Sequence, residues 1–148
     1  PDFHARYGAK RKRYCYTIYN GPTRTPFYRT TAWHLVHPLS LPKMRAAARH
    51  LTGPHDFTSF CATENDAKDY VIDLARLTIH KQENRITLTL EAPRFLRYMV
   101  RNIVGFLVAI GYGKRSATEI PSILAARDRR RAGPTAPPHG LCLVKIDY

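Results

Sequence analysis

The sequence predicts an α+β fold in which helices cover a mixed, largely antiparallel sheet. Apolar and polar residues alternate with a period of two over residues 10–20 and 85–91, as in strands with one buried face. Over residues 94–111, apolar residues instead recur every three or four positions, as in a helix packed on a core. Strands and helices follow one another without strict alternation, which disfavours a purely parallel α/β sheet.

Residues 10–20 are predicted to form the first strand, which begins with a basic run and becomes rich in tyrosine. Tyr14, Tyr16 and Ile18 share one face of this strand, and an Asn-Gly-Pro sequence ends it. A second extended segment is expected over residues 31–37.

A helix is predicted next, over residues 42–51. Ser40 is a candidate N-cap, proline is tolerated in the first turn, and Gly53 supplies a stop signal. The residues expected to face inward are Met44, Ala47, Ala48 and Leu51. Residues 54–68 are expected to form a loop with a short helical turn.

Two further strands are predicted over residues 71–80 and 85–91, joined by a connection of hairpin length. The second strand has the clearer pattern, because Ile86, Leu88 and Leu90 alternate with polar residues. These two segments are therefore expected to pair in an antiparallel manner.

The longest helix is predicted over residues 94–111, where a cationic stripe runs beside the apolar one. Arg94, Arg97, Arg101 and Gly105 recur at helical spacing. Arg101 lies deepest in the apolar pattern, and an unpaired guanidinium near a core is costly because it cannot be deprotonated. Arg101 is therefore predicted to have an acidic partner or an anionic ligand.

The last part of the chain is predicted to contain a short helix and a closing strand. Ser116 and Glu119 form a candidate capping box, and Pro121 limits the helix to a start near its own position. A loop rich in glycine and proline is expected at 133–140, followed by a strand at 141–148.

The charge balance favours a polyanionic partner. The 148 residues carry 24 Lys and Arg against 11 Asp and Glu, a net charge of +13, and nucleic acid is the usual partner of such a chain. A solubilising surface is the alternative interpretation. The length fits a single domain over residues 1–148, with enough apolar residues for a core.

Metal, disulfide and membrane functions are disfavoured. Cys15, Cys61 and Cys142 are widely separated and form no CxxC motif, which fits a reducing compartment. His34 and His37 would point to opposite faces of an extended segment, so no metal site is predicted. No apolar stretch is long enough to cross a bilayer.

Two aromatic residues in the first strand are candidates for chemistry. Tyr14 and Tyr16 follow the basic run at 10–13, and a strand of this kind can hold phosphates while an aromatic ring stacks on a base. The alternative is that both tyrosines belong to the core of a half-buried strand.

Arg101 also has two interpretations. It either neutralises a catalytic carboxylate or a phosphate, or forms a structural salt bridge. The candidate partners for such a salt bridge are Asp56, Asp73 and Glu91.

Several segments together resemble the tRNA pseudouridine synthase A family, in the family's order and from one end of the chain to the other. They are Asp2–Arg6, Arg13–Tyr16, Gly53–Phe60, Phe95–Gly105, Asp128–Arg129, Ala132–Pro137 and Gly140–Val144. Each segment is weak evidence alone, but the set is highly specific.

The resemblance implies an isomerase that breaks the N-glycosidic bond of a uridine, rotates the base and rejoins it to the sugar through carbon. Its substrates would be uridines of the tRNA anticodon stem-loop, and no metal or organic cofactor is expected. Tyr14 matches the tyrosine that stacks on the target base, Arg101 the arginine that pairs with the catalytic aspartate, and Leu141 an apolar residue of the base pocket. The residues expected to contact RNA are His4, Arg6, Lys10, Arg11, Lys12, Arg13 and Arg97.

One departure from the family pattern bears on activity. The family's catalytic aspartate lies in an Arg-Thr-Asp-Ala-Gly-Val-His-type motif upstream of the segment that resembles residues 2–6, and these 148 residues contain no such motif. The chain therefore resembles the C-terminal part of a synthase and is expected to be inactive alone. The alternatives are a non-catalytic RNA-binding module and one subunit of a split synthase. The complete enzyme is expected to be a homodimer in the cytoplasm or an organelle matrix.

Overall fold

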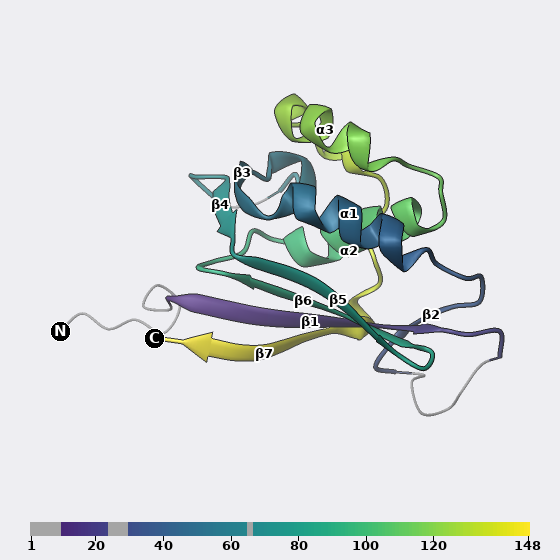
Figure 1. The fold of residues 1–148 in the computed structure, drawn as a ribbon. Coiled ribbons are helices and arrows are strands. Elements are labelled where there is room, and N and C mark those ends of the chain that lie inside the picture. The colour runs from purple at the N-terminus through teal and green to yellow at the C-terminus, as the bar shows by residue number, and fades with distance from the viewer. Residues whose placement is uncertain (1–9, 24–29, 65–66) are drawn as a thin grey trace.

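The computed structural model describes residues 10–23, 30–64 and 67–148, and its main feature is a five-stranded sheet (Figure 1). The strands are β1 (Arg11–Asn20), β2 (Trp33–Leu35), β5 (Arg76–Gln82), β6 (Arg85–Ala92) and β7 (Leu141–Asp147). Their order is β2-β1-β6-β5, and β7 pairs with the first part of β1. Only β2 runs parallel to its neighbour, so the prediction of a largely antiparallel α+β sheet is confirmed.

Three helices lie on one side of this sheet (Figure 1). They are α1 (Leu41–Leu51), α2 (Met99–Gly111) and α3 (Ile120–Ala126), and α3 is the furthest from the sheet. Within the described residues, no helix covers the opposite face. The core therefore lies between the sheet and α1 and α2.

The alternation in β1 places its side chains as the sequence predicts. Tyr16 and Ile18 are fully buried under the helices, and Tyr14 lies on the same face, partly buried against the core. Tyr16 also donates a hydrogen bond from its hydroxyl to the carbonyl of Pro137, at 2.6 Å. The polar atom of this buried ring is thus satisfied, and Tyr16 has a structural role.

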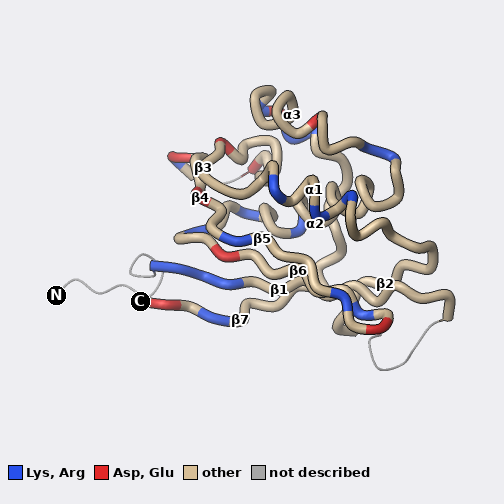
Figure 2. Tube along the Cα trace, viewed as in Figure 1, with Lys and Arg blue, Asp and Glu red and all other residues tan. Residues whose placement is uncertain are grey.

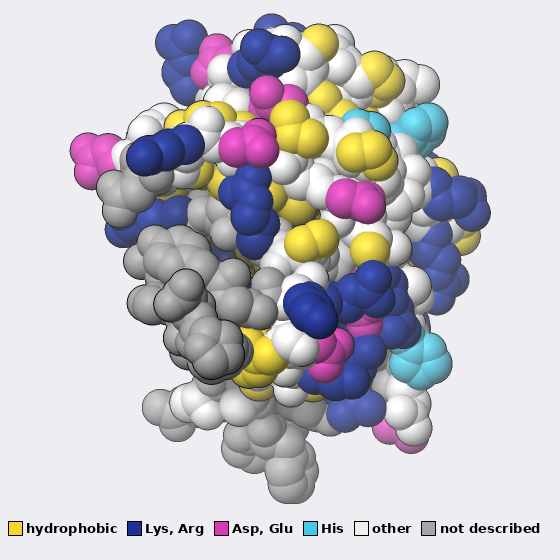
Figure 3. Space-filling view, turned by 90° about the vertical axis from the view of Figure 1, so that its left-hand side faces the viewer, with side chains coloured by type: hydrophobic (Ala, Val, Ile, Leu, Met, Phe, Trp, Pro, Cys, Tyr) yellow, Lys and Arg dark blue, Asp and Glu magenta, His cyan; other side chains and the backbone are white. Residues whose placement is uncertain are grey.

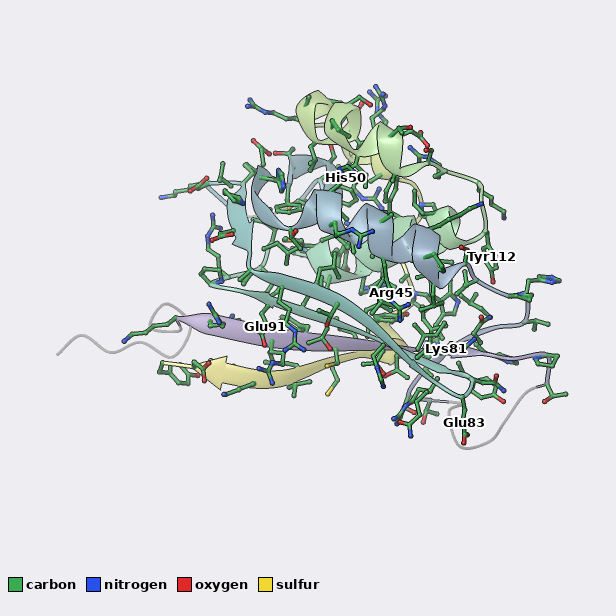
Figure 4. All side chains as sticks on the ribbon, in the orientation of Figure 1. Arg45, His50, Lys81, Glu83, Glu91 and Tyr112 are labelled. Atoms are coloured by element: carbon green, nitrogen blue, oxygen red, sulfur yellow. The ribbon has the colours of Figure 1, made fainter. Side chains whose placement is uncertain are left out.

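Helix α1 begins and ends close to its predicted bounds. The Ser40 hydroxyl accepts a hydrogen bond from the backbone N–H of Lys43, as an N-cap does. The four predicted inward residues are all buried. Arg45, labelled in Figure 4, donates from its guanidinium to the carbonyl of Ile79 at 3.2 and 3.0 Å, which joins α1 to β5.

The region around residues 53–74 differs from the prediction. Gly53–Asp56 is a strand, β3, and it pairs antiparallel with β4 (Val71–Leu74) in a separate two-stranded sheet. The predicted strand 71–80 is therefore two strands, divided at Ala75, whose N–H donates to the carbonyl of Glu91 at 2.8 Å. The predicted helical turn is present as a 3₁₀ turn at Thr58–Phe60.

The predicted helix 94–111 begins five residues later, at Met99. Tyr98 adopts a left-handed backbone conformation with φ of 63°, which a continuous right-handed helix excludes. The carbonyl of Arg97 is also engaged elsewhere, because it accepts from the N–H of Ala62 at 2.9 Å. Arg94 and Arg97 therefore precede the helix, and the predicted cationic stripe does not exist as a helical face.

The C-terminal elements follow the sequence signals closely. The capping box of Ser116 and Glu119 is present on a 3₁₀ turn, Ala117–Glu119, which leads into α3. Two more 3₁₀ turns follow. Arg129–Ala132 precedes the predicted loop at 133–140, and Pro138–Gly140 lies at its end, just before β7. This loop contacts α2, where the N–H of Ala136 donates to the Arg101 carbonyl, and leads into β7, which pairs with the first part of β1.

Candidate functional site

A wide groove opens where the segment before α2 meets the first part of β1. It encloses about 1220 Å³. Its wall is formed largely by the continuous segment 93–101, and the other lining residues are Lys12, Tyr14, Glu64, Ala67, Lys68, Pro138 and Leu141. Tyr14, Arg101 and Leu141, the three predicted catalytic positions, thus line one groove although they are far apart in the sequence.

Tyr14 lies in the groove with its ring held by an aromatic neighbour. Its ring meets that of Phe95 edge-on, with centroids 5.0 Å apart and planes at 90°. Partial burial raises the pKa of the Tyr14 hydroxyl, so the phenol remains protonated at neutral pH. The Tyr14 ring is therefore an uncharged aromatic surface in the wall of the groove.

Arg101 is held by a carbonyl oxygen and an aromatic ring. Its Nε donates to the carbonyl of Ala136 at 2.8 Å, and its guanidinium lies 4.8 Å from the centroid of the Tyr98 ring. Its positive charge also opposes the rise in the pKa of Tyr16 that burial causes, which places the charge near β1. In the part of the chain that the structure describes, these contacts use Nε and the face of the guanidinium and leave both Nη groups to donate to an anion.

The structural salt bridge considered for Arg101 is not formed among the described residues. Glu91 is within ion-pair distance of Arg11, Arg13 and Arg76 instead. Asp56 pairs with Arg127 at 3.3 Å. The positive charge of Arg101 thus has no carboxylate partner within residues 10–23, 30–64 and 67–148.

The predicted RNA-binding run at 10–13 is divided between the two faces of the sheet. Lys12 lines the groove beside Tyr14, whereas Arg13 points to the opposite face, where its Nε donates to Glu91. Arg11 lies on that opposite face as well, and Lys10 is exposed at the start of the strand. Only part of the run can therefore contact a ligand bound in the groove.

Glu91, labelled in Figure 4, is a buried carboxylate that organises the cations of the opposite face. Its exposed fraction is 6%, and Arg76 Nη1 lies 3.3 Å from its Oε1. Burial alone would raise the pKa of Glu91, but the hydrogen bond from Arg13 and the charges of Arg13 and Arg76 outweigh it and lower the pKa. The carboxylate is therefore ionised at neutral pH.

We expect Glu91→Gln to lower the free energy of unfolding at pH 7 by about 2 kcal/mol, the usual value of hydrogen bonds to a charged group. Because the folded-state pKa is depressed, this contribution is present above the unfolded pKa of a glutamate, about 4.3, and is lost as the pH falls through the folded-state value. Urea unfolding of both forms at pH 7 and in acid checks this, and the difference between them should shrink in acid. A difference that stays constant would show that charge is not involved.

Arg97, for which RNA contact is predicted, lines the groove, and so does Tyr98, to which the sequence pattern gave no role. Tyr98 is 45% exposed, and the Arg97 guanidinium lies 5.1 Å from its ring centroid. No spacing or composition signal marks this tyrosine, because its place in the groove follows from its left-handed backbone conformation, with φ of 63°. His4 and Arg6 lie outside the described residues.

Lys and Arg residues are spread along most of the chain, with a run at the start of β1 and a single lysine in the neighbouring β7 (Figure 2). The end of the molecule at which β1 begins shows clustered cations with carboxylates and apolar side chains between them (Figure 3). Aromatic rings beside cations in an open groove are typical of proteins that bind or modify nucleotides, which require both stacking and phosphate contacts. The α+β fold and its groove have the features of that class of protein.

Comparison with known proteins narrows this class. A family model described as tRNA pseudouridine synthase matches residues 47–148, so the chain belongs to the tRNA pseudouridine synthase family. Proteins named tRNA pseudouridine synthase A from Shouchella clausii and Moorella thermoacetica are both 46% identical to it over 148 residues, and one from Myxococcus xanthus is 41% identical. These matches cover 99–100% of this chain but only 57%, 60% and 56% of the three relatives, so the chain spans little more than half of their length.

None of the helices in the described ranges combines the length and the apolar character needed to cross a bilayer.

Proposed function

We propose that the complete protein isomerises uridine to pseudouridine in tRNA, and that this chain supplies the base-binding and arginine-bearing half of the active site. One observation carries this proposal. Tyr14, Arg101 and Leu141 line the same groove, and the guanidinium of Arg101 is fixed there without a carboxylate partner among the described residues.

The groove suits a base that has been taken out of its stack. An enzyme that acts on a nucleobase has to unstack it and hold it against an aromatic or apolar surface. Tyr14 supplies the aromatic surface, and Leu141, which is partly buried against the core, supplies an apolar wall. We assign Tyr14 to stacking on the target uridine and Leu141 to lining its pocket.

Arg101 would complete the site by pairing with a catalytic aspartate from outside these residues. Its two Nη groups can donate in parallel to one carboxylate, which is the strongest geometry for such a pair. An adjacent guanidinium also keeps a carboxylate ionised in a desolvated pocket, as a nucleophile must be. No metal or organic cofactor is needed for this step.

The cations around the groove would contact the phosphates of tRNA. Lys12, Lys68, Arg94 and Arg97 line the groove itself. Lys10, Arg11 and Arg13, together with His4 and Arg6, would extend this contact beyond the groove. We further propose that the complete protein acts as a homodimer, in the cytoplasm or an organelle matrix.

We expect the isolated 148-residue chain to make no pseudouridine. Forming the carbon–carbon bond displaces the hydrogen on carbon 5 of uridine, so tRNA labelled there with tritium releases label only on turnover. Release should stay at background with the isolated chain and be clear with the longer protein that carries this sequence. Turnover by the isolated chain would contradict the proposed division of the active site.

The same assay separates the proposal from its alternatives. If a separate polypeptide with the Arg-Thr-Asp motif restores release when mixed with this chain, the protein is a split synthase. If the chain binds tRNA with a steep salt dependence and neither such a polypeptide nor the longer protein gives release, the chain is an RNA-binding module.

A further inference from the structure

Arg129 is a half-buried cation that contacts only neutral oxygens among the described residues. Its Nη1 donates to the carbonyl of Gly133 at 2.7 Å. Its Nη2 donates to Asn102 Oδ1 at 3.0 Å and to Thr135 Oγ1 at 2.8 Å. Moving a guanidinium out of water carries a desolvation cost, and three uncharged acceptors offset it less than a carboxylate would. An exposed arginine would avoid this cost.

Arg129, Asn102 and Thr135 form one hydrogen-bond network, and Asn102 follows Arg101 in the sequence. Asn102 is 1% exposed, and its Nδ2 donates to the carbonyl of Phe60 at 2.8 Å. Its Oδ1 accepts from Arg129 and also from the Thr135 hydroxyl, at 2.6 Å. The amide can therefore adopt only one orientation, in which its oxygen faces the loop at 133–137.

That loop is the segment on which the Arg101 side chain rests. The N–H of Ala136 donates to the Arg101 carbonyl at 3.1 Å, while Arg101 Nε donates back to the carbonyl of Ala136 at 2.8 Å. Tyr16 holds the next carbonyl, that of Pro137, at 2.6 Å. Arg129 and Thr135 fix the loop immediately before these contacts, so the position of the Ala136 carbonyl depends on both.

We propose that Arg129 and Thr135 are positioning residues for Arg101, because they fix the Ala136 carbonyl that orients its guanidinium toward the groove. This inference rests on the role proposed above for Arg101. Arg129 itself stands apart from the groove lining, so it acts on the reaction only through the loop and Arg101.

The test measures kcat and KM for pseudouridine formation by the longer protein that carries this sequence, with Thr135 altered in two ways. Thr135→Val keeps the shape of the side chain but removes its hydroxyl, whereas Thr135→Ser keeps the hydroxyl. We expect Thr135→Val to lower kcat roughly tenfold, since small misplacements of a catalytic group have effects of this size or larger. KM should stay within about twofold, because the groove surface is unchanged, and Thr135→Ser should restore kcat.

Matched variants isolate the role of Arg129. Arg129→Lys keeps the charge but cannot reach three acceptors in a fixed fork, and it should lower kcat as Thr135→Val does. Arg130→Gln is the control, since the Arg130 side chain is 89% exposed and pairs only with Asp128, at 3.0 Å, among the described residues. It should leave kcat and KM unchanged.

Two outcomes would overturn this inference. Thr135→Val could lower the melting temperature while the folded protein keeps its full kcat, which would make the network purely structural. Thr135→Ser could also fail to restore kcat. Arg101→Gln, measured in parallel, separates the two proposals. If Arg101→Gln retains activity, the proposed role of Arg101 is wrong. If Arg101→Gln is inactive while Thr135→Val is fully active, only the positioning role is refuted.

Discussion

Arg101→Leu in the complete protein is expected to reduce pseudouridine formation by about 10²- to 10³-fold, because one preorganised electrostatic contact at a reaction centre can contribute this much. The leucine removes both Nη donors that would hold the catalytic carboxylate in its ionised state. An aspartate left without this partner in a desolvated pocket would have a raised pKa and would lose nucleophilicity. The variant should therefore show this loss over the whole neutral pH range.

The same substitution should change stability only slightly. The Arg101 side chain makes one hydrogen bond, from Nε to the Ala136 carbonyl at 2.8 Å, and no ion pair among the described residues. Losing one such bond costs about 1 kcal/mol, and the added apolar contact of leucine offsets part of it. Urea unfolding of the isolated chain, in which Arg101 has no carboxylate partner among the described residues, should show a difference of about this size.

Arg97→Gln is the matched control for Arg101→Leu. Arg97 lines the same groove and contacts the same Tyr98 ring, but it precedes the helix and has no predicted role in catalysis. Its loss should weaken tRNA binding and reduce the salt slope of binding by about one, as expected for one phosphate contact. An inactive Arg97→Gln, or an active Arg101→Leu, would contradict the assignment of roles in the groove.

Local sequence signals predicted most of the elements correctly. The N-cap at Ser40 and the capping box at Ser116 are satisfied by hydrogen bonds within a few residues, so they leave a readable pattern. The alternation in β1 also distinguishes Lys12 from Arg13, since neighbouring residues of a strand face opposite ways. The division of the basic run between two faces was therefore present in the sequence.

The start of α2 and the second sheet could not be predicted in this way. The apolar spacing of residues 95–98 fits a helix, but the Arg97 carbonyl bonds to the N–H of Ala62, which is distant in sequence. Tertiary contacts of this kind override local propensity. Strand β3 likewise exists only because β4 pairs with it, and a short Gly-Pro segment carries no strand signal of its own.

The contacts of Arg101 were only half predictable. Its place in an apolar pattern implied a partner, and the sequence offered carboxylates as candidates. The partner found is a backbone carbonyl of the loop at 133–137, a group that every residue possesses and that no composition signal can mark. The groove itself could not be predicted, because residues from β1, the segment 93–101 and the start of β7 form it together.

Gly105→Ala is expected to destabilise the complete protein by about 3 kcal/mol, the upper end of the usual cost of overpacking. A methyl group at this position of α2 would lie 2.2 Å from the carbonyl oxygen of Pro134, which belongs to the backbone of the loop that positions Arg101. Alanine would otherwise favour the helix by about 1 kcal/mol over glycine, so the sign of the result shows that the clash dominates.

Gly111→Ala is the control in the same helix, because its methyl group would meet the flexible side chains of Met44 and Leu39, at 2.8 and 2.9 Å, which can move aside. Urea unfolding should show a clearly larger loss for Gly105→Ala, together with reduced kcat as the loop is displaced; equal losses for the two variants would contradict close packing of this loop on α2.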